Sequence, residues 1–141
     1  MLKITSILFC LFYLSLCSAQ SLPDKFKLKG MMIIYKDNDG DYLYHKDWKP
    51  VDYLAVFDPE NKKLKIYTSS DALDGDFDII RAEKMQKTDN GDIVFKLKVI
   101  DKKGRECAAS FITLKNENEG FQSFIKIDYG NIAMVYRYKD E

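Results

Sequence analysis

The residues most suggestive of chemistry form an acidic run, Asp37-Asn38-Asp39-Gly40-Asp41. Three carboxylates at alternate positions resemble the start of a calcium-binding loop, in which such oxygens coordinate the cation. A loop of that type beginning at Asp37 needs glycine at its sixth position and glutamate at its twelfth. Those positions hold Tyr42 and Trp48. Because strand-forming residues flank the run and Asp-Gly tolerates tight turns, we expect a hairpin turn and no metal site.

The other reactive side chains are the single histidine, His45, and Cys107. A zinc site usually draws on several His or Cys ligands, and no serine or carboxylate pair stands in a recognisable catalytic arrangement. Cys107 alternates with Ala109 and Phe111, which indicates an inward strand face where a thiol packs as a small hydrophobe. We therefore expect His45 at the surface, no catalytic residue, no cofactor, and a protein that is not an enzyme.

Aromatic side chains are concentrated in one segment, which is the best candidate for a binding surface. The candidate residues are Tyr42, Tyr44, His45, Trp48 and Tyr53. Aromatic residues with polar edges are favoured where a surface binds a protein or a ring. The alternative is that the two first tyrosines share a strand face and that Trp48 closes one end of the core.

The segments that must position these residues have the pattern of strands. Asn-Gly, Asp-Gly and similar turn signals recur every 8 to 15 residues. Between them, apolar residues occupy alternate positions, as in 93–99, which predicts antiparallel strands with one face in the core. The expected strands are 25–35, 41–46, 52–57, 63–68, 76–84, 92–100, 106–114, 121–129 and 132–138, with a possible helical turn at 69–73. We predict an all-β antiparallel meander of about 8–9 strands, forming a small barrel or a two-layer sandwich.

The N-terminal residues 1–19 have the layout of a secretory signal peptide. Lys3 supplies a positive charge, an apolar run follows to Leu16, and Cys17-Ser18-Ala19 provides small residues before a cleavage site. The apolar run is too short for a transmembrane helix, and Leu16 before Cys17 does not fit a lipoprotein site. We expect an exported chain, periplasmic or secreted, without a stable membrane anchor, whose residues 20–141 form one domain.

Charge excludes one class of partner. The chain has 22 basic and 22 acidic residues, and these are interspersed rather than grouped. A neutral domain without a basic stripe has little affinity for a phosphate backbone, so we expect no nucleic acid to bind. Cleavage after residue 19 would leave Cys107 as the only cysteine, without an intrachain disulfide partner.

Four segments share a recurring pattern: Tyr53-Leu54-Ala55-Val56-Phe57-Asp58, Lys63-Leu64-Lys65-Ile66-Tyr67, Phe77-Asp78-Ile79-Ile80, and the strand, D-x-x-G turn and returning Cys of 99–107. Together with a signal that ends in Ala19-Gln20, they resemble small exported β-proteins of Bacteroidota whose function is uncharacterised. The resemblance implies an all-β fold and export, and it brings no activity. Such proteins often carry a second Cys before the turn. Here Lys98 and Val99 stand near that position, so the hairpin disulfide is lost.

Two functions follow as hypotheses. The first is a non-enzymatic module that binds another protein through the aromatic segment. The alternative is a lipocalin-like carrier of a small apolar ligand, although the Gly-x-Trp signature of lipocalins is absent near the first strand. In the carrier, the residues expected to line the interior are Phe26, Met32, Ile34, Phe95, Leu97, Ile127, Met134 and Tyr136.

Overall fold

The computed structural model describes residues 24–70, 72–116 and 120–138, and every regular element within them is a β-strand. The strands are β1 (Asp24–Lys36), β2 (Tyr42–His45), β3 (Lys49–Asp58), β4 (Lys63–Tyr67), β5 (Leu73–Ala82), β6 (Gln86–Lys87), β7 (Ile93–Asp101), β8 (Glu106–Asn116), β9 (Gly120–Asp128) and β10 (Ile132–Tyr138). The expected signal peptide lies outside these residues. Within them no helix has the length and apolar character needed to cross a membrane.

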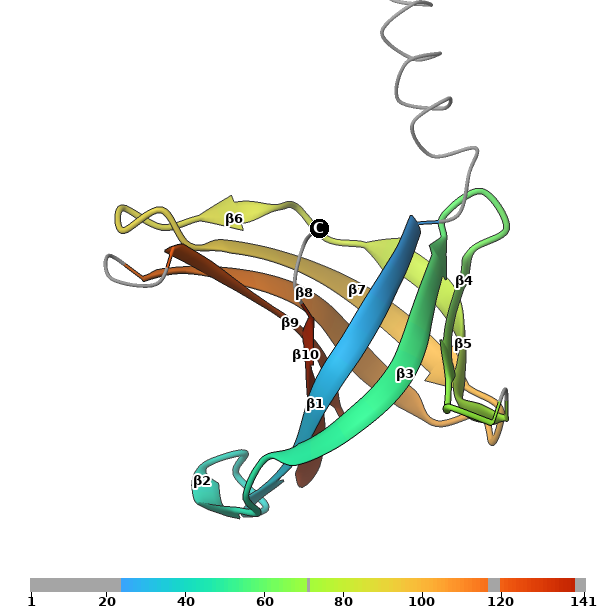
Figure 1. Ribbon diagram of the computed structural model, residues 1–141, viewed down its shortest axis with the longest axis horizontal. Coiled ribbons are helices and arrows are strands. Elements are labelled where there is room, and N and C mark those ends of the chain that lie inside the picture. The colour runs from blue at the N-terminus through green and yellow to red at the C-terminus, as the bar shows by residue number, and fades with distance from the viewer. Residues whose placement is uncertain (1–23, 71, 117–119, 139–141) are drawn as a thin grey trace, which may run out of the picture.

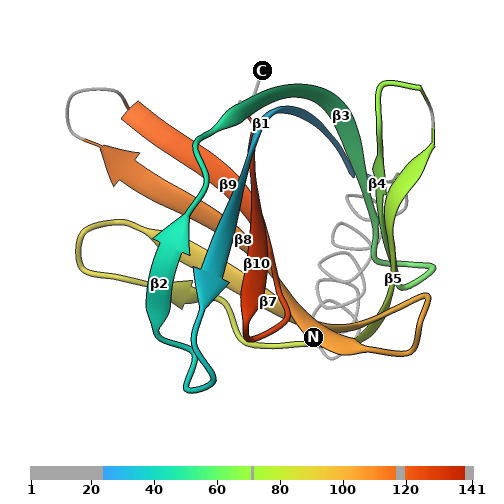
Figure 2. The same cartoon turned by 90° about the horizontal axis from the view of Figure 1, so that it is seen from below.

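Eight strands close into an antiparallel barrel. Neighbours follow the order β10-β9-β8-β7-β5-β4-β3-β1, and β1 also pairs with β10, which completes the circle. Figures 1 and 2 show these strands wrapping around a common interior. The predicted all-β meander is therefore confirmed, and the structure has the barrel rather than the sandwich.

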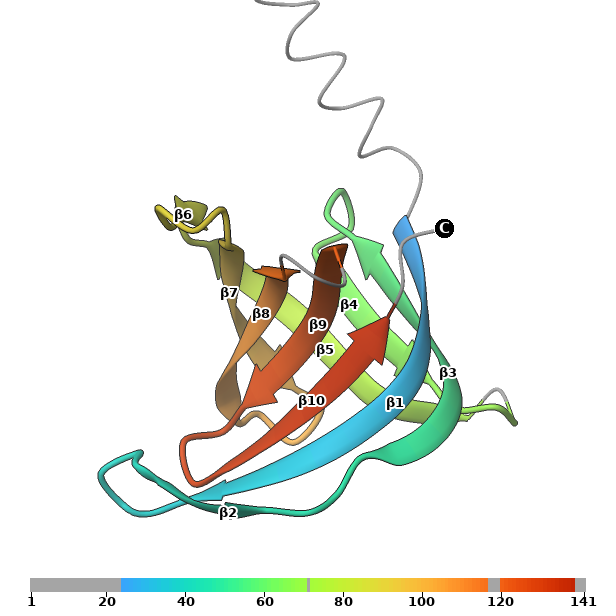
Figure 3. The ribbon, with the colours of Figure 1, turned by 60° about the vertical axis from the view of Figure 1, so that its left-hand side comes forward.

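Two strands are additions to the barrel. β2 pairs with the last residues of β1, and β6 pairs with the first residues of β7. Figure 3 shows β2 and the end of β1 projecting together beyond the barrel wall. The sequence pattern predicted β2 but missed the two-residue β6. Ser69 and Ser70 form a turn and Leu73 already belongs to β5, so the helical turn expected at 69–73 is not seen in the described part of that segment.

A register shift in β1 corrects the expected interior. Leu28 pairs with Tyr138 while Gly30 pairs with Arg137, so one extra residue of β1 stands opposite the β10 ladder. Side chains alternate between the two faces of a strand, and an inserted residue reverses that alternation. Phe26 and Leu28 face the interior before the shift. Beyond it, Met31 packs against the core.

The expectation that Met32 and Ile34 line the interior is therefore wrong. Met32 pairs with Val135 and Ile34 with Ala133, on the face opposite to Met134 and Tyr136. The apolar alternation of residues 26–34 continues across the shift because Gly30 has no side chain, so the sequence gives no sign that the inward-facing positions change there. The other six expected lining residues all lie in the core cluster or pack against it, including Phe26, which precedes the shift.

Side chains fill the middle of the barrel. The largest fully buried ones are Tyr136, Leu28, Leu64, Ile66, Leu97, Ile125, Ile127 and Val99. Above them Phe111 contacts three further rings, with centroid distances of 5.7 Å to Phe26, 5.2 Å to Phe57 and 6.4 Å to Phe95. Tilted ring pairs at such distances add to the stabilisation from burial. The centre of the barrel is thus a packed core.

We expect Leu64→Ala to lower the free energy of unfolding by about 2 to 5 kcal/mol, because it leaves a cavity in this core. The matched control is Leu43→Ala on β2, where the leucine is 57% exposed and the change should stay within about 0.5 kcal/mol. Urea denaturation followed by circular dichroism measures both. Equal effects of the two substitutions would contradict the described packing.

Candidate functional site

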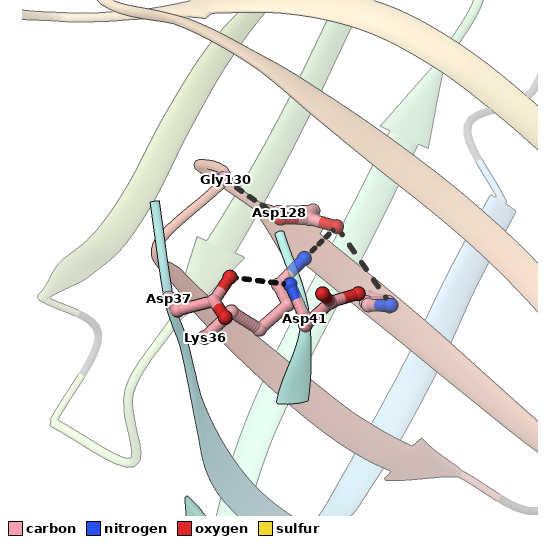
Figure 4. A network of polar contacts seen from close by, with 6 residues as sticks. Lys36, Asp37, Asp41, Asp128 and Gly130 are labelled. Carbon is pink, nitrogen blue, oxygen red and sulfur yellow. Dashed lines mark hydrogen bonds and ion pairs between the residues drawn. The ribbon is translucent and has the colours of Figure 1, made fainter. Parts of the chain in front are cut away.

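The acidic run forms the turn between β1 and β2. The Asp37 carboxylate accepts hydrogen bonds from the amides of Asp39 and Asp41, both at 2.9 Å, and the Gly40 amide donates to the Asp37 carbonyl at 3.0 Å. Gly40 has a φ of 85°, a conformation that other residues rarely adopt. Backbone amides of the turn therefore bind one carboxylate oxygen, Oδ1 of Asp37, as Figure 4 shows for Asp41, which makes the run a hairpin turn.

An ion pair ties the base of this turn to the barrel. The Lys36 ammonium lies 2.6 Å from the Asp128 carboxylate, which also accepts a hydrogen bond from the Gly130 amide at 2.8 Å (Figure 4). Partial burial acts to raise the pKa of Asp128, but Lys36 and the Gly130 amide stabilise the carboxylate and hold that pKa below its usual value. The arrangement is a structural anchor between β1 and the end of β9.

The structure brings three of the five candidate binding residues together on β2. The Tyr42 hydroxyl and His45 Nδ1 form a hydrogen bond, and the Tyr44 ring stacks on Tyr35 with centroids 4.6 Å apart. Tyr42, Leu43 and Tyr44 are 58%, 57% and 54% exposed. Three consecutive exposed side chains mean that both faces of β2 meet solvent.

The other two candidates lie elsewhere. Trp48 packs on the outer wall of the barrel, where its ring stacks with Phe124 at 6.1 Å and the Arg137 guanidinium lies 5.0 Å above it. Gly30 permits this contact, since a Cβ there would lie 3.3 Å from Trp48. Tyr53 faces the interior and packs against Tyr136. Trp48 thus covers the wall rather than an end of the core.

One end of the barrel holds an apolar cavity of about 510 Å³. Its walls come from the end of β3, the turn into β4, the end of β5, the segment before β6 and the start of β7. The lining residues are Phe57, Pro59, Lys62, Ile79, Ile80, Arg81, Ala82, Met85, Phe95 and Leu97. Phe57 and Phe95 contact Phe111, so the floor of this apolar cavity is the ring cluster of the core.

A register shift in β5 forms one side of the apolar cavity. Ile79 pairs with Val99 while Arg81 pairs with Lys98, which leaves Ile80 as an extra residue. Ile80 is 44% exposed and Met85 is 59% exposed, although both are large and apolar. A volume of this size lies within the range of small-molecule sites, which are mostly apolar with a few polar groups.

The opposite end of the barrel is polar. A cavity of about 270 Å³ is lined there by the start of β5, the β7–β8 turn, Tyr129 just after β9, and Met134 and Tyr136 of β10. The Tyr136 hydroxyl donates to Asp74 at 3.0 Å, and the Tyr129 hydroxyl donates to Asp101 at 3.1 Å. Burial raises the pKa of both tyrosines, and the neighbouring carboxylates raise it further. Both therefore act as neutral hydrogen-bond donors.

Asp101 and Arg105 complete the polar end. The Arg105 guanidinium donates to Asp101 at 2.8 Å and stacks on the Tyr129 ring at 4.8 Å. Burial acts to raise the pKa of Asp101, but hydrogen bonds from Arg105, Tyr129 and Lys103 outweigh it and lower that pKa. Nearby, Asp76 Oδ1 is buried without a hydrogen-bond partner, 4.0 Å from the Lys63 ammonium.

Cys107 is buried on the inner face of β8, as its alternation predicted. Burial raises the pKa of its thiol to about 11, which leaves little reactive thiolate at neutral pH. His45 is exposed on β2 and contacts Tyr42. Among the described residues, no three His, Cys, Asp or Glu side chains are grouped to hold a metal ion.

Comparison with protein-family models, curated proteins and solved structures finds no match for this chain. The resemblance to exported proteins of Bacteroidota therefore stays a prediction, as do export and the expectation that the chain is not an enzyme. The fold and the two cavities stand on the geometry alone.

Of the residues expected to line a carrier's interior, Phe95 and Leu97 line the apolar cavity, and Met134 and Tyr136 line the polar one. Sequence reasoning missed the other lining residues, because each cavity joins residues from strands far apart in the chain. One local signal was present for the apolar end. Ile79 and Ile80 are adjacent apolar residues in a segment that otherwise alternates, and such a pair is typical of a bulge that exposes one of them.

We expect iodoacetamide to modify Cys107 roughly a hundredfold more slowly in the folded protein than in urea at pH 8, because the thiolate fraction falls as the pKa rises. Mass spectrometry of the peptide containing Cys107 measures the rate and separates it from Cys10 and Cys17. Rates that agree within a factor of two would contradict the burial of this thiol.

Proposed function

We propose that this protein binds a small apolar molecule in the apolar cavity at the β3–β4 end of the barrel, which favours the carrier hypothesis. The observation that carries the proposal is an apolar space of about 510 Å³ at the mouth of a closed barrel. Eight-stranded barrels can hold one small ligand. Because the centre is packed, the ligand would sit at the mouth, above the rings of Phe57 and Phe95.

Exposure of apolar side chains supports the proposal. Ile80 and Met85 line the apolar cavity while remaining about half exposed. Apolar surface that stays in water costs free energy, at about 25 cal/mol for each Å² that a ligand would cover. A bound apolar molecule would remove this surface from water, which gives the two side chains a role that core packing does not supply.

We expect the purified protein to bind Nile red with increased fluorescence, and Ile80→Glu to weaken that binding about tenfold or more, since a carboxylate in an apolar site is poorly solvated. The matched control is Leu114→Glu, where the leucine is 39% exposed and lies outside the apolar cavity. Fluorescence titration measures affinity, and circular dichroism checks that each variant folds. Absence of binding, or equal affinity of the two variants, would reject the site.

A second candidate function, binding of another protein through β2, is favoured by one specific observation. Within the described residues β2 pairs only with β1, so its other edge is open, and its side chains Tyr42, Leu43 and Tyr44 are all more than half exposed. An open edge can accept a further strand through backbone hydrogen bonds. Partner binding here leaves the apolar cavity free, so the two functions are compatible.

A photo-reactive amino acid in place of Leu43 tests this second function in native extracts. We expect one discrete cross-linked species, because an edge strand orients its partner in a fixed register. The same amino acid in place of Leu114 is the control, since that side chain is also exposed. No cross-linking at position 43 above that at position 114 counts against the interaction surface.

A further inference from the structure

We propose that the ligand of the apolar cavity is an amphiphile with an anionic head group, whose tail lies on the aromatic floor and whose head is bound by Lys62 and Arg81. This inference rests on the proposed function and names its ligand class. It follows from the charged side chains around the apolar cavity, which are all positive.

The charged residues that line the apolar cavity are both cationic. They are Lys62 and Arg81, and no carboxylate among the described residues lines it. Lys62 and Arg81 are exposed, whereas Phe57, Phe95 and Leu97 are more buried. Arg81 pairs with Lys98 and stands at the edge of the apolar cavity, where it also lines an adjacent outer cavity with Glu83 and Glu106. A tail-first ligand would therefore place its head group beside an ammonium and a guanidinium. The guanidinium matches a carboxylate or phosphate through paired hydrogen bonds.

Neither cation is fully committed to a partner within the chain. Among the described residues Arg81 forms one ion pair, with Glu83, at a long distance of 3.8 Å and with both groups substantially exposed. Such surface pairs contribute little. For Lys62, the described residues contain no ion pair of the ammonium, whereas the next residue, Lys63, pairs with Asp76 and Asp78. The two cations are thus available to a ligand.

The backbone holds Lys62 at the rim in an unusual conformation. It has a φ of 54° and is the single non-glycine residue with positive φ in the described part of the chain. Its amide donates to the Pro59 carbonyl at 3.2 Å, and its carbonyl accepts from the Ile79 amide at 2.9 Å, which joins the turn to the wall of the apolar cavity. Asparagine or glycine adopts this conformation with less strain. A lysine here keeps a positive charge at the mouth at a conformational cost.

The test compares three ligands with the same tail: dodecanoate, dodecanol and dodecyltrimethylammonium. Isothermal titration calorimetry at neutral pH, below the micelle concentration, measures their affinities for the full chain. We expect dodecanoate to bind about tenfold more tightly than dodecanol, and dodecyltrimethylammonium to bind most weakly. The preference should shrink at high salt, because the rim is exposed and its charges are screened.

The variants are Lys62→Asn and Arg81→Gln, separately and together. Asparagine tolerates the positive φ of position 62, and both positions are exposed, so the fold should be retained, which circular dichroism checks. We expect the double variant to lose the preference for dodecanoate while its affinity for dodecanol stays within a factor of two. The control with an equal loss of charge is Lys102→Gln with Lys103→Gln at the polar end, which should keep the preference.

Each outcome separates this inference from the function on which it rests. Equal binding of dodecanoate and dodecanol, unaffected by the variants, overturns the anionic head group and leaves the apolar site intact. Tightest binding of dodecyltrimethylammonium also overturns it. If none of the three ligands binds and Nile red does not bind either, the proposed function itself is wrong.

Discussion

The pairing of β1 with β10 is the interaction on which the rest of the structure depends. It joins the first strand of the barrel to the last, over the span from Leu28 to Tyr35. Without it both strands would be sheet edges with unpaired amides and carbonyls, and the apolar faces of the strands would surround no closed interior. The core, the two cavities and the projection of β2 all exist because this ladder closes.

Closure requires β1 to pair with three other strands. Its first residues pair with β3 on one edge, its last residues pair with β2 on that same edge, and β10 occupies the opposite edge. The extra residue before Gly30 lets the strand bend between these partners, since a bulge increases local twist. The bend also brings the glycine under Trp48, so that an aromatic ring lies directly on the backbone of the closing strand. The closure of the barrel and the packing of Trp48 on its outer wall therefore depend on the same segment of β1.

The sequence was sufficient to predict most of the strands but insufficient to predict which side chains of β1 face the interior. In β7 the alternation from Ile93 to Val99 is regular, and the structure places Phe95, Leu97 and Val99 in or against the core. In β1 the same reasoning placed Met32 and Ile34 inside, because pattern alone does not reveal which residue a bulge inserts. Trp48 was predicted either to belong to a binding surface or to close an end of the core, yet the cover it provides depends on Gly30 and Arg137, which lie far from it in the chain. Long-range contacts of this kind have no local signature.

The two ends of the barrel differ because different groups close them. At the polar end, hydroxyl groups of Tyr129 and Tyr136 reach carboxylates across the opening, and each hydrogen bond fixes a side chain in place. At the apolar end the floor is fixed by the contacts of Phe57 and Phe95 with Phe111, whereas the rim consists of exposed side chains that the core does not need. Residues of the rim can therefore be substituted without disturbing the rings of the floor. Substitution of a floor ring disturbs the core, while substitution at the rim changes the lining of the apolar cavity at little cost to folding. A barrel of this construction can therefore change the shape and charge of its mouth while its core stays the same.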